Sequence, residues 1–134
     1  MKHHELAREL PCEPVGSIEG HADVAWSAPL LLCALESALE RFRPHVPSIN
    51  ALNVFPVPDG DTGTNMLLTL EAAVRAAQGA RAQTAGDLLR EAARGALMGA
   101  RGNSGVILYQ VFAGLAEGVD GQLALDGAAL ARGL

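Results

Sequence analysis

Apolar residues recur along this chain at the three- and four-residue spacing of amphipathic helices. Polar, proline-containing or glycine-containing stretches separate the segments that carry this pattern. The predicted helices are Trp26–Phe42, Asn65–Gln78, Thr84–Met98 and Gly105–Glu117, and a further one covers Gly127–Leu134 after a cap at Asp126. Only Ala51–Val57 leans toward a strand, and Pro56 and Pro58 demote it to an extended loop. The pattern predicts an all-α fold of closely packed amphipathic helices.

Short polar residues mark the expected starts of these helices. Thr84 precedes Asp87 at the spacing of a capping box, and Pro29 is tolerated in the first turn of the first helix. We expect the other caps to come from Thr62, Thr64, Asn65 and Ser104. With Ser104 as the cap, the backbone N–H groups of residues 105–107 would be unpaired.

Composition agrees with one helical domain. The chain has 134 residues, of which 49% are hydrophobic and 4% aromatic, so its core must be built from Ala, Leu and Val. We expect residues 1–25 to be a loosely attached leader with a short helix at His4–Leu10, and residues 26–134 to form the domain. Cys12 and Cys33 lack a Cys-x-x-Cys spacing, and no structural disulfide is expected.

Charge and hydropathy exclude some classes of protein. A net charge of -5 without a basic cluster argues against nucleic-acid binding. The apolar run Ala28–Leu35 is too short to span a bilayer, and the start lacks the layout of a signal peptide. We therefore expect a cytoplasmic protein.

The segment with the most chemical content is residues 53–65, which read Asn-Val-Phe-Pro-Val-Pro-Asp-Gly-Asp-Thr-Gly-Thr-Asn. Asp59 and Asp61 are close enough to repel each other unless a cation lies between them, and hard oxygen ligands favour Mg²⁺ or Ca²⁺. An EF-hand loop counted from Asp59 fails, since Thr64 and Leu70 occupy the positions that need Gly and Glu. A solvated Asp/Gly turn before a helix remains the plain alternative.

A second glycine-rich turn, residues 99–105, reads Gly-Ala-Arg-Gly-Asn-Ser-Gly and also precedes a helix. It is neither a Walker A loop nor a dinucleotide fingerprint, because the lysine of the first and the preceding strand of the second are missing. An ordinary loop between helices explains this turn equally well. Two such helix starts, one of them supplied with carboxylates, nevertheless indicate a Mg²⁺–nucleotide site.

Together the two motifs resemble a known family. Asn-Val-Phe-Pro-Val-Pro-Asp-Gly-Asp-Thr-Gly-Thr-Asn-Met, followed by Ala-Arg-Gly-Asn-Ser-Gly-Val-Ile, is similar to the N-terminal kinase domain of the bacterial fatty acid kinase A subunit. That domain is related to the L subunit of dihydroxyacetone kinase, and the resemblance runs from about Leu30 to Val119. It implies a barrel-like bundle of antiparallel helices with ATP or ADP and two Mg²⁺ ions at one mouth.

The resemblance also implies roles for individual residues. Asp59 and Asp61 would be metal ligands, and Asn53 lies near the position of a further metal-binding aspartate in the dihydroxyacetone kinase branch. Contacts to phosphates or metal would come from Thr62, Thr64, Asn65, Asn103 and Ser104. Neither motif contains a convincing general base. In the family the acceptor is presented by a separate protein.

Three functions follow as hypotheses. The first is transfer of the γ-phosphate of ATP to a fatty acid carboxylate presented by a DegV-like fatty-acid-binding protein, which the Pro-Val-Pro-Asp-Gly-Asp-Thr form favours. The second is transfer to a hydroxyl of dihydroxyacetone held by a K-type subunit. The third is a truncated, non-catalytic nucleotide-binding or interaction remnant.

The third hypothesis arises because the family's kinase domain is longer than this chain and has several more helices. We therefore expect a bundle that is incomplete at its C-terminus and that is marginally stable, self-associates or needs the missing segment in trans. Inner faces left without partners would expose Leu31, Leu35, Leu70, Val74, Leu88, Leu97, Val111 and Leu115.

Overall fold

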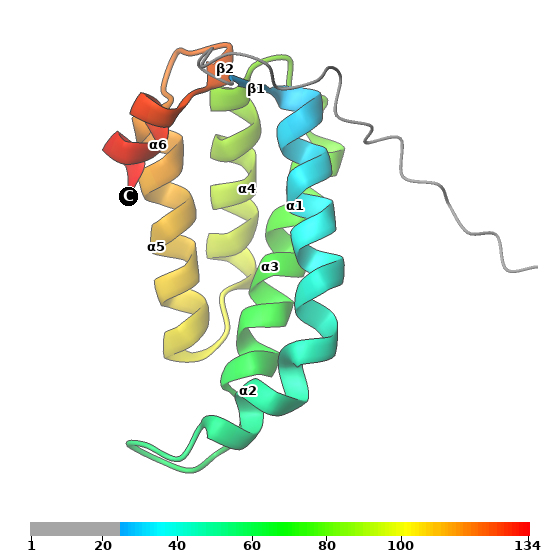
Figure 1. Cartoon of the computed structure of the whole chain (residues 1–134), viewed down its shortest axis with the longest axis vertical. Helices are drawn as coiled ribbons and strands as arrows, with labels where there is room; N and C mark the ends of the chain where they lie inside the picture. Colours follow the sequence, from blue (N-terminus) through cyan, green and yellow to red (C-terminus); the bar gives the residue numbers. More distant parts are fainter. Residues whose placement is uncertain (1–24) are drawn as a thin grey trace, which may run out of the picture.

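The computed structural model describes residues 25–134, which form a set of helices with one very short sheet (Figure 1). The elements are β1 (Trp26–Ser27), α1 (Ala28–Phe42), the 3-10 helix η1 (Arg43–His45), α2 (Val46–Leu52), α3 (Thr62–Gly79), α4 (Ala85–Gly99), α5 (Gly102–Gly118), β2 (Ala124–Leu125) and α6 (Gly127–Gly133). The predicted all-α antiparallel bundle is confirmed.

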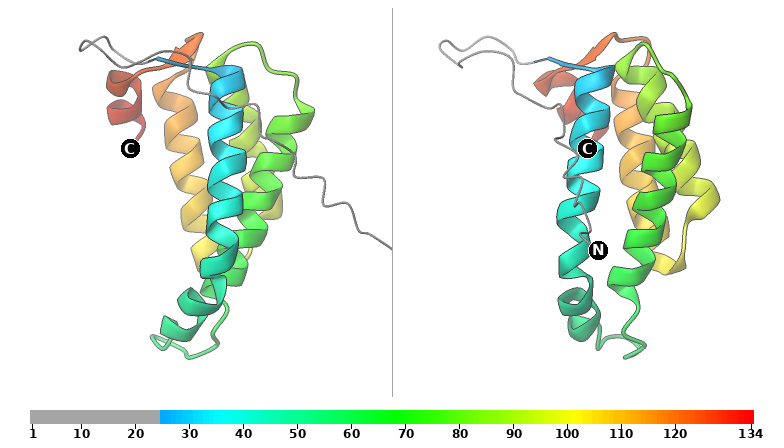
Figure 2. Two further views of the ribbon diagram at one scale, coloured as in Figure 1. Left: turned by 45° about the vertical axis from the view of Figure 1, so that its right-hand side comes forward. Right: turned by 90° about the vertical axis from the view of Figure 1, so that its right-hand side faces the viewer.

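The four long helices α1, α3, α4 and α5 run alternately down and up the molecule (Figures 1 and 2). The strands β1 and β2 and the short helix α6 lie at the upper end in Figure 1, where α6 packs against α5. Helix α2 and the loop that follows it lie at the lower end. Because α3 and α5 both run upward, their N-terminal ends meet the α2–α3 loop at this lower end.

Helix α4 contributes more residues to the buried core than any other helix of the described part. It contacts α1, α3 and α5, and its inward face is nearly all alanine, leucine and glycine. The small residues bring the backbones close together: a Cβ atom on Gly95 would lie 2.5 Å from the carbonyl oxygen of Ala72 on α3. The core therefore consists of Ala, Leu and Val as expected, with Phe112 the one aromatic ring among its buried residues in the described part.

Several predicted helix ends were wrong. The first helix begins at Ala28 because Trp26 and Ser27 pair antiparallel with Leu125 and Ala124. Helices α3 and α5 each begin three residues earlier than predicted, and α2 was not predicted at all. Thr84 does cap α4, since its hydroxyl accepts the N–H of Asp87 at 3.0 Å. The predicted leader lies outside the described residues except for Ala25.

The expected exposed stripe was largely wrong. Leu31, Val74 and Leu88 are at most 5% exposed because α1, α3 and α4 bury them against one another. Leu97 and Val111 are exposed as expected, at 53% and 41%.

Two further expectations concern cysteine and membranes. Cys33 on α1 is disulfide-bonded, so the expectation of no structural disulfide was wrong. A disulfide requires only that folding bring two cysteines together, whatever their spacing in the sequence. Within residues 25–134, none of the helices has the length and hydropathy needed to cross a membrane.

Candidate functional site

A pocket of about 350 Å³ lies at the end of the bundle where α3 and α5 begin. Its walls come from the α2–α3 loop and from the first turns of these two helices. It brings together seven predicted site residues, namely Asn53, Asp59, Asp61, Thr62, Asn65, Asn103 and Ser104. Thr64, the eighth, does not line it. Two motifs that are separate in the sequence therefore face one space.

The α2–α3 loop carries the two carboxylates. Gly60 between them has a φ of +64°, a left-handed conformation that glycine adopts without steric cost and that allows the sharp turn from Asp59 to Asp61. Both side chains are exposed, and neither forms an ion pair with any residue between 25 and 134. The pocket thus contains two solvent-accessible carboxylates that no cation of residues 25–134 pairs with.

The start of α3 is capped from outside the helix. Oδ1 of Asn53 accepts the backbone N–H groups of Asp61 and Thr62, both at 3.1 Å. Asn50, on α2, accepts the N–H of Thr64 at 3.2 Å and donates its amide N–H to the Thr64 hydroxyl at 3.0 Å.

These bonds correct the predicted cap. Thr62, Thr64 and Asn65 lie inside α3, and two asparagines that precede the loop do the capping. Most N–H groups of this helix start are therefore occupied. Asn50 was missed because it lies on α2, a helix that the apolar pattern did not reveal.

The start of α5 has no such cap. The helix begins at Gly102 after Arg101, and no side chain of the described residues caps it. Ser104 is therefore not the N-cap, and the N–H of Gly105 donates to the carbonyl of Arg101 at 3.0 Å. The groups that lack a partner within the helix belong to its first turn, Gly102 to Ser104, and all three residues line the pocket.

Asn65 joins the two helix starts. Gly102 has a φ of +60°, and a Cβ atom placed on it would lie 2.6 Å from Nδ2 of Asn65. Only a residue without a side chain allows this approach of the α5 turn to α3. The pocket is therefore a single site formed by both motifs.

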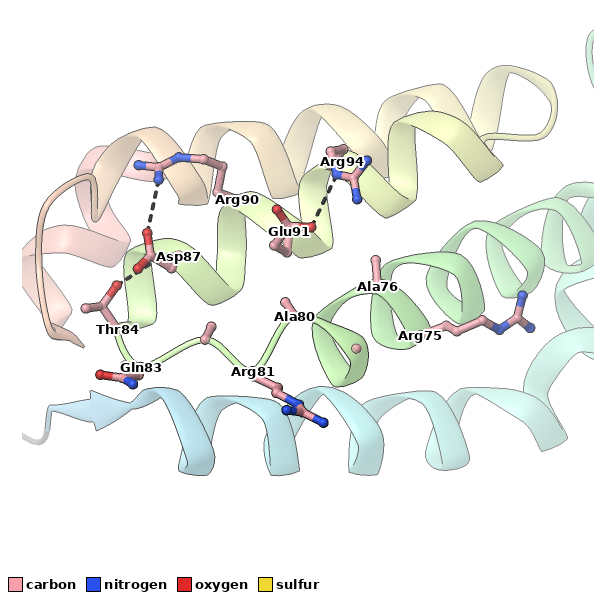
Figure 3. Close-up of a pocket in the computed structure, with 12 residues that line it drawn as sticks. Arg75, Ala76, Ala80, Arg81, Gln83, Thr84, Asp87, Arg90, Glu91 and Arg94 are labelled. Carbon is pink, nitrogen blue, oxygen red and sulfur yellow. Dashed lines mark hydrogen bonds and ion pairs between the residues drawn. The ribbon is translucent and has the colours of Figure 1, made fainter.

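A larger pocket, of about 780 Å³, lies beside the α3–α4 connection (Figure 3). Four arginines line it, but Arg90 and Arg94 form ion pairs with Asp87 and Glu91 of their own helix. Arg75 and Arg81 point in different directions in Figure 3, Arg81 toward α1. The arginines do not converge on one point, so this pocket lacks the geometry of an anion site.

Within residues 25–134, no group of three or more His, Cys, Asp or Glu side chains could hold a metal ion by itself. The pocket at the starts of α3 and α5 thus offers two carboxylates, five amide or hydroxyl side chains (Asn53, Thr62, Asn65, Asn103 and Ser104) and an uncapped helix N-terminus. Carboxylates bind hard cations, and a helix N-terminus binds anions. The arrangement suits a cation and a phosphate bound side by side.

Comparison with known proteins agrees with the motifs. An uncharacterized protein of Staphylococcus saprophyticus is 49% identical over 76 residues, which cover 57% of this chain and 14% of that protein. One of Staphylococcus aureus strain USA300 is 43% identical over 84 residues, covering 63% of this chain and 15% of that protein. The chain thus spans about one seventh of the length of these relatives. Residues 56–134, more than half of the chain, match the family model described as the DAK2 domain, and the chain belongs to that family.

Proposed function

We propose that this chain is the nucleotide-binding part of an ATP-dependent kinase that phosphorylates a fatty acid carboxylate presented by a DegV-like fatty-acid-binding protein. The observation that carries the proposal is the pocket in which Asp59 and Asp61 face the uncapped first turn of α5. Membership of the DAK2 family supports a kinase-related domain that binds ATP or ADP. The resemblance of both motifs to the fatty acid kinase A subunit supports this acceptor.

The donor set of the pocket fits Mg²⁺. In kinase-type sites Mg²⁺ is usually held by one or two carboxylates together with substrate phosphates, and Asp59 and Asp61 provide that number. Bound there, Mg²⁺ would offset the charge of the β- and γ-phosphates and of the departing ADP. We leave Asn53 out of the ligand set because its carbonyl oxygen already accepts two backbone N–H groups.

The remaining residues would hold the phosphates. The first-turn N–H groups of α5 belong to residues that line the pocket, and Asn65, Asn103 and Ser104 add side-chain donors beside them. In the reaction, an acceptor oxygen forms a bond to the γ-phosphorus while the bond from that phosphorus to the β–γ bridging oxygen breaks, and ADP leaves. The chain's part is to align these groups and to neutralise charge.

The lining of the pocket favours a carboxylate as the acceptor. Among its described lining residues, the only titratable side chains are Asp59 and Asp61, and the proposal assigns both to the cation. A fatty acid is already ionised near neutral pH and needs no general base, whereas a hydroxyl of dihydroxyacetone must lose a proton.

The use of ATP as the donor implies that the protein acts in the cytoplasm. A disulfide at Cys33 would face reducing conditions there.

The metal assignment is tested by calorimetry of ATP binding with Mg²⁺ and with EDTA. Asp59→Asn and Asp61→Asn keep side-chain size and remove charge, so each should weaken Mg²⁺–ATP binding at least about tenfold, or about 1.4 kcal/mol. Both variants should stay folded, because neither carboxylate is buried. The matched control is Glu117→Gln, an exposed α5 residue outside this pocket, which should bind as the unmodified chain does. Equal affinity with and without EDTA would defeat the metal assignment.

The acceptor is tested with ATP labelled at the γ-phosphate. Label should enter a fatty acid when the cognate fatty-acid-binding protein is present. Label in dihydroxyacetone, with a K-type subunit present, would instead support the second hypothesis. Nucleotide binding without label in either acceptor would favour the non-catalytic remnant.

A further inference from the structure

Thr69 is the one polar side chain that is fully buried in the described part of the chain, at 0% exposed. It lies on α3, one turn beyond Asn65, and its hydroxyl donates to the carbonyl of Asn65 at 2.8 Å. A bond from a threonine hydroxyl to the carbonyl four residues earlier is common in helices. The same oxygen also makes a second bond, and that one is not local.

Oγ1 of Thr69 accepts the backbone N–H of Arg101 at 3.3 Å. Arg101 is the N-cap residue of α5, so this bond ties the start of α5 directly to α3. Gly105, one turn later, packs on the same oxygen, because a Cβ atom there would lie 2.4 Å from Oγ1. The hydroxyl is therefore enclosed between the two helices that form the pocket.

We propose that Thr69 is a positioning residue for this site, whose hydroxyl orients the Ala100–Arg101 peptide and thereby directs the first-turn N–H groups of α5 into the pocket. It lines no part of the pocket and acts through Arg101 and Asn65. The inference rests on the proposed function, in which these N–H groups hold phosphate.

The hydroxyl, rather than the volume of the side chain, carries this role. Valine has nearly the shape of threonine, but in Thr69→Val the partly buried N–H of Arg101 would lose its acceptor. The peptide would turn to find another partner and would rotate Gly102, which already lies against Asn65. Serine keeps the oxygen and gives up only a methyl group, so Thr69→Ser should preserve the turn.

The test compares Thr69→Val with Thr69→Ser in the whole chain. Calorimetry should show Mg²⁺–ATP binding weakened about tenfold or more in Thr69→Val and less than about threefold in Thr69→Ser. Adenosine, which has no phosphate, should bind equally to both variants and to the unmodified chain. An equal loss for adenosine and Mg²⁺–ATP, or a normal affinity of folded Thr69→Val for Mg²⁺–ATP, would overturn the proposal.

Amide hydrogen exchange gives a readout that needs no nucleotide, and its first measurement uses the unmodified chain. In the unmodified chain the Arg101 amide should exchange at least about tenfold more slowly than the amides of Gly102 and Asn103, which have no such acceptor. Thr69→Val should remove this protection and Thr69→Ser should keep it. An unprotected Arg101 amide in the unmodified chain would refute the positioning role. If the Arg101 amide is protected from exchange but the chain binds no ATP, the proposed function is wrong and the hydrogen bond between Arg101 and Thr69 is still supported.

Discussion

Replacing Asn53 by alanine removes the acceptor for two backbone N–H groups at the start of α3. Both bonds, from Asp61 and Thr62, are 3.1 Å long and converge on one carbonyl oxygen. No other side chain among the described residues bonds these two groups. The substitution therefore removes a helix cap that acts from the end of α2, across the α2–α3 loop.

The cost follows from what is known of caps. Loss of an N-cap side chain destabilises a protein by about 0.5–2 kcal/mol, and each net hydrogen bond contributes about 0.5–1.5 kcal/mol. Asn53 is only half-buried, so water can replace part of both bonds. We expect a loss of about 1.5 kcal/mol for Asn53→Ala. For a domain of this size that lowers the melting temperature by about 6 °C.

Urea denaturation measures the loss in the free energy of unfolding directly, and two further variants serve as comparisons. Asn53→Asp keeps an acceptor and places a negative charge at a helix N-terminus, so it should retain most of the stability. Gln110→Ala changes an exposed residue on α5 and should stay within about 0.5 kcal/mol. The Mg²⁺ dependence of ATP binding should survive in Asn53→Ala. Unchanged stability together with lost Mg²⁺ dependence would show that Asn53 is a metal ligand and that the capping role is wrong.

Two further predictions concern the start of α5. Ser104→Ala should weaken ATP binding, since Ser104 lines the pocket, but should change the free energy of unfolding by less than about 0.5 kcal/mol, since Ser104 does not cap the helix. A loss of about 1 kcal/mol in urea denaturation would show that Ser104 is a cap. Gly105→Ala should cost at least about 2 kcal/mol, because its methyl group would lie 2.4 Å from Oγ1 of the buried Thr69. Its control is Gly127→Ala, where nothing lies within 4 Å of the new Cβ atom, and equal melting temperatures for these two glycine variants would contradict the close packing.

The long helices could be predicted from the sequence because burying a helix against its neighbours requires an apolar stripe, and that stripe is visible as spacing. The ends of these helices were harder to predict from the sequence. The first helix starts two residues late because Trp26 and Ser27 pair with a strand at the far end of the chain. Helix α2 was missed because seven residues with Pro47 in the first turn are too few to show a stripe.

The site was predicted in part for a similar reason. The carboxylates and both glycine-rich turns are local patterns, and the motifs that resemble the kinase family linked them as one hypothesis. Asn50 and Thr69 show no local pattern. Each is a polar residue within a helix, and its importance depends on an N–H group that folding brings to it from another part of the chain. Such partners cannot be identified from spacing alone.

Two features constrain how the proposed nucleotide would bind: the negative charge of the pocket, and the N–H groups at the start of α3 that already donate to Asn50 and Asn53. Two carboxylates line the pocket, and no basic side chain does among its described lining residues, so the polyphosphate of ATP alone would be repelled. The N–H groups of α3 offer little compensation, because Asn50 and Asn53 already occupy them. Only the first turn of α5 remains to attract an anion, and a helix N-terminus carries about half a unit of positive charge. That is less than the two carboxylate charges, so we predict that a nucleotide binds at this pocket only together with a divalent cation that both aspartates share with the phosphates.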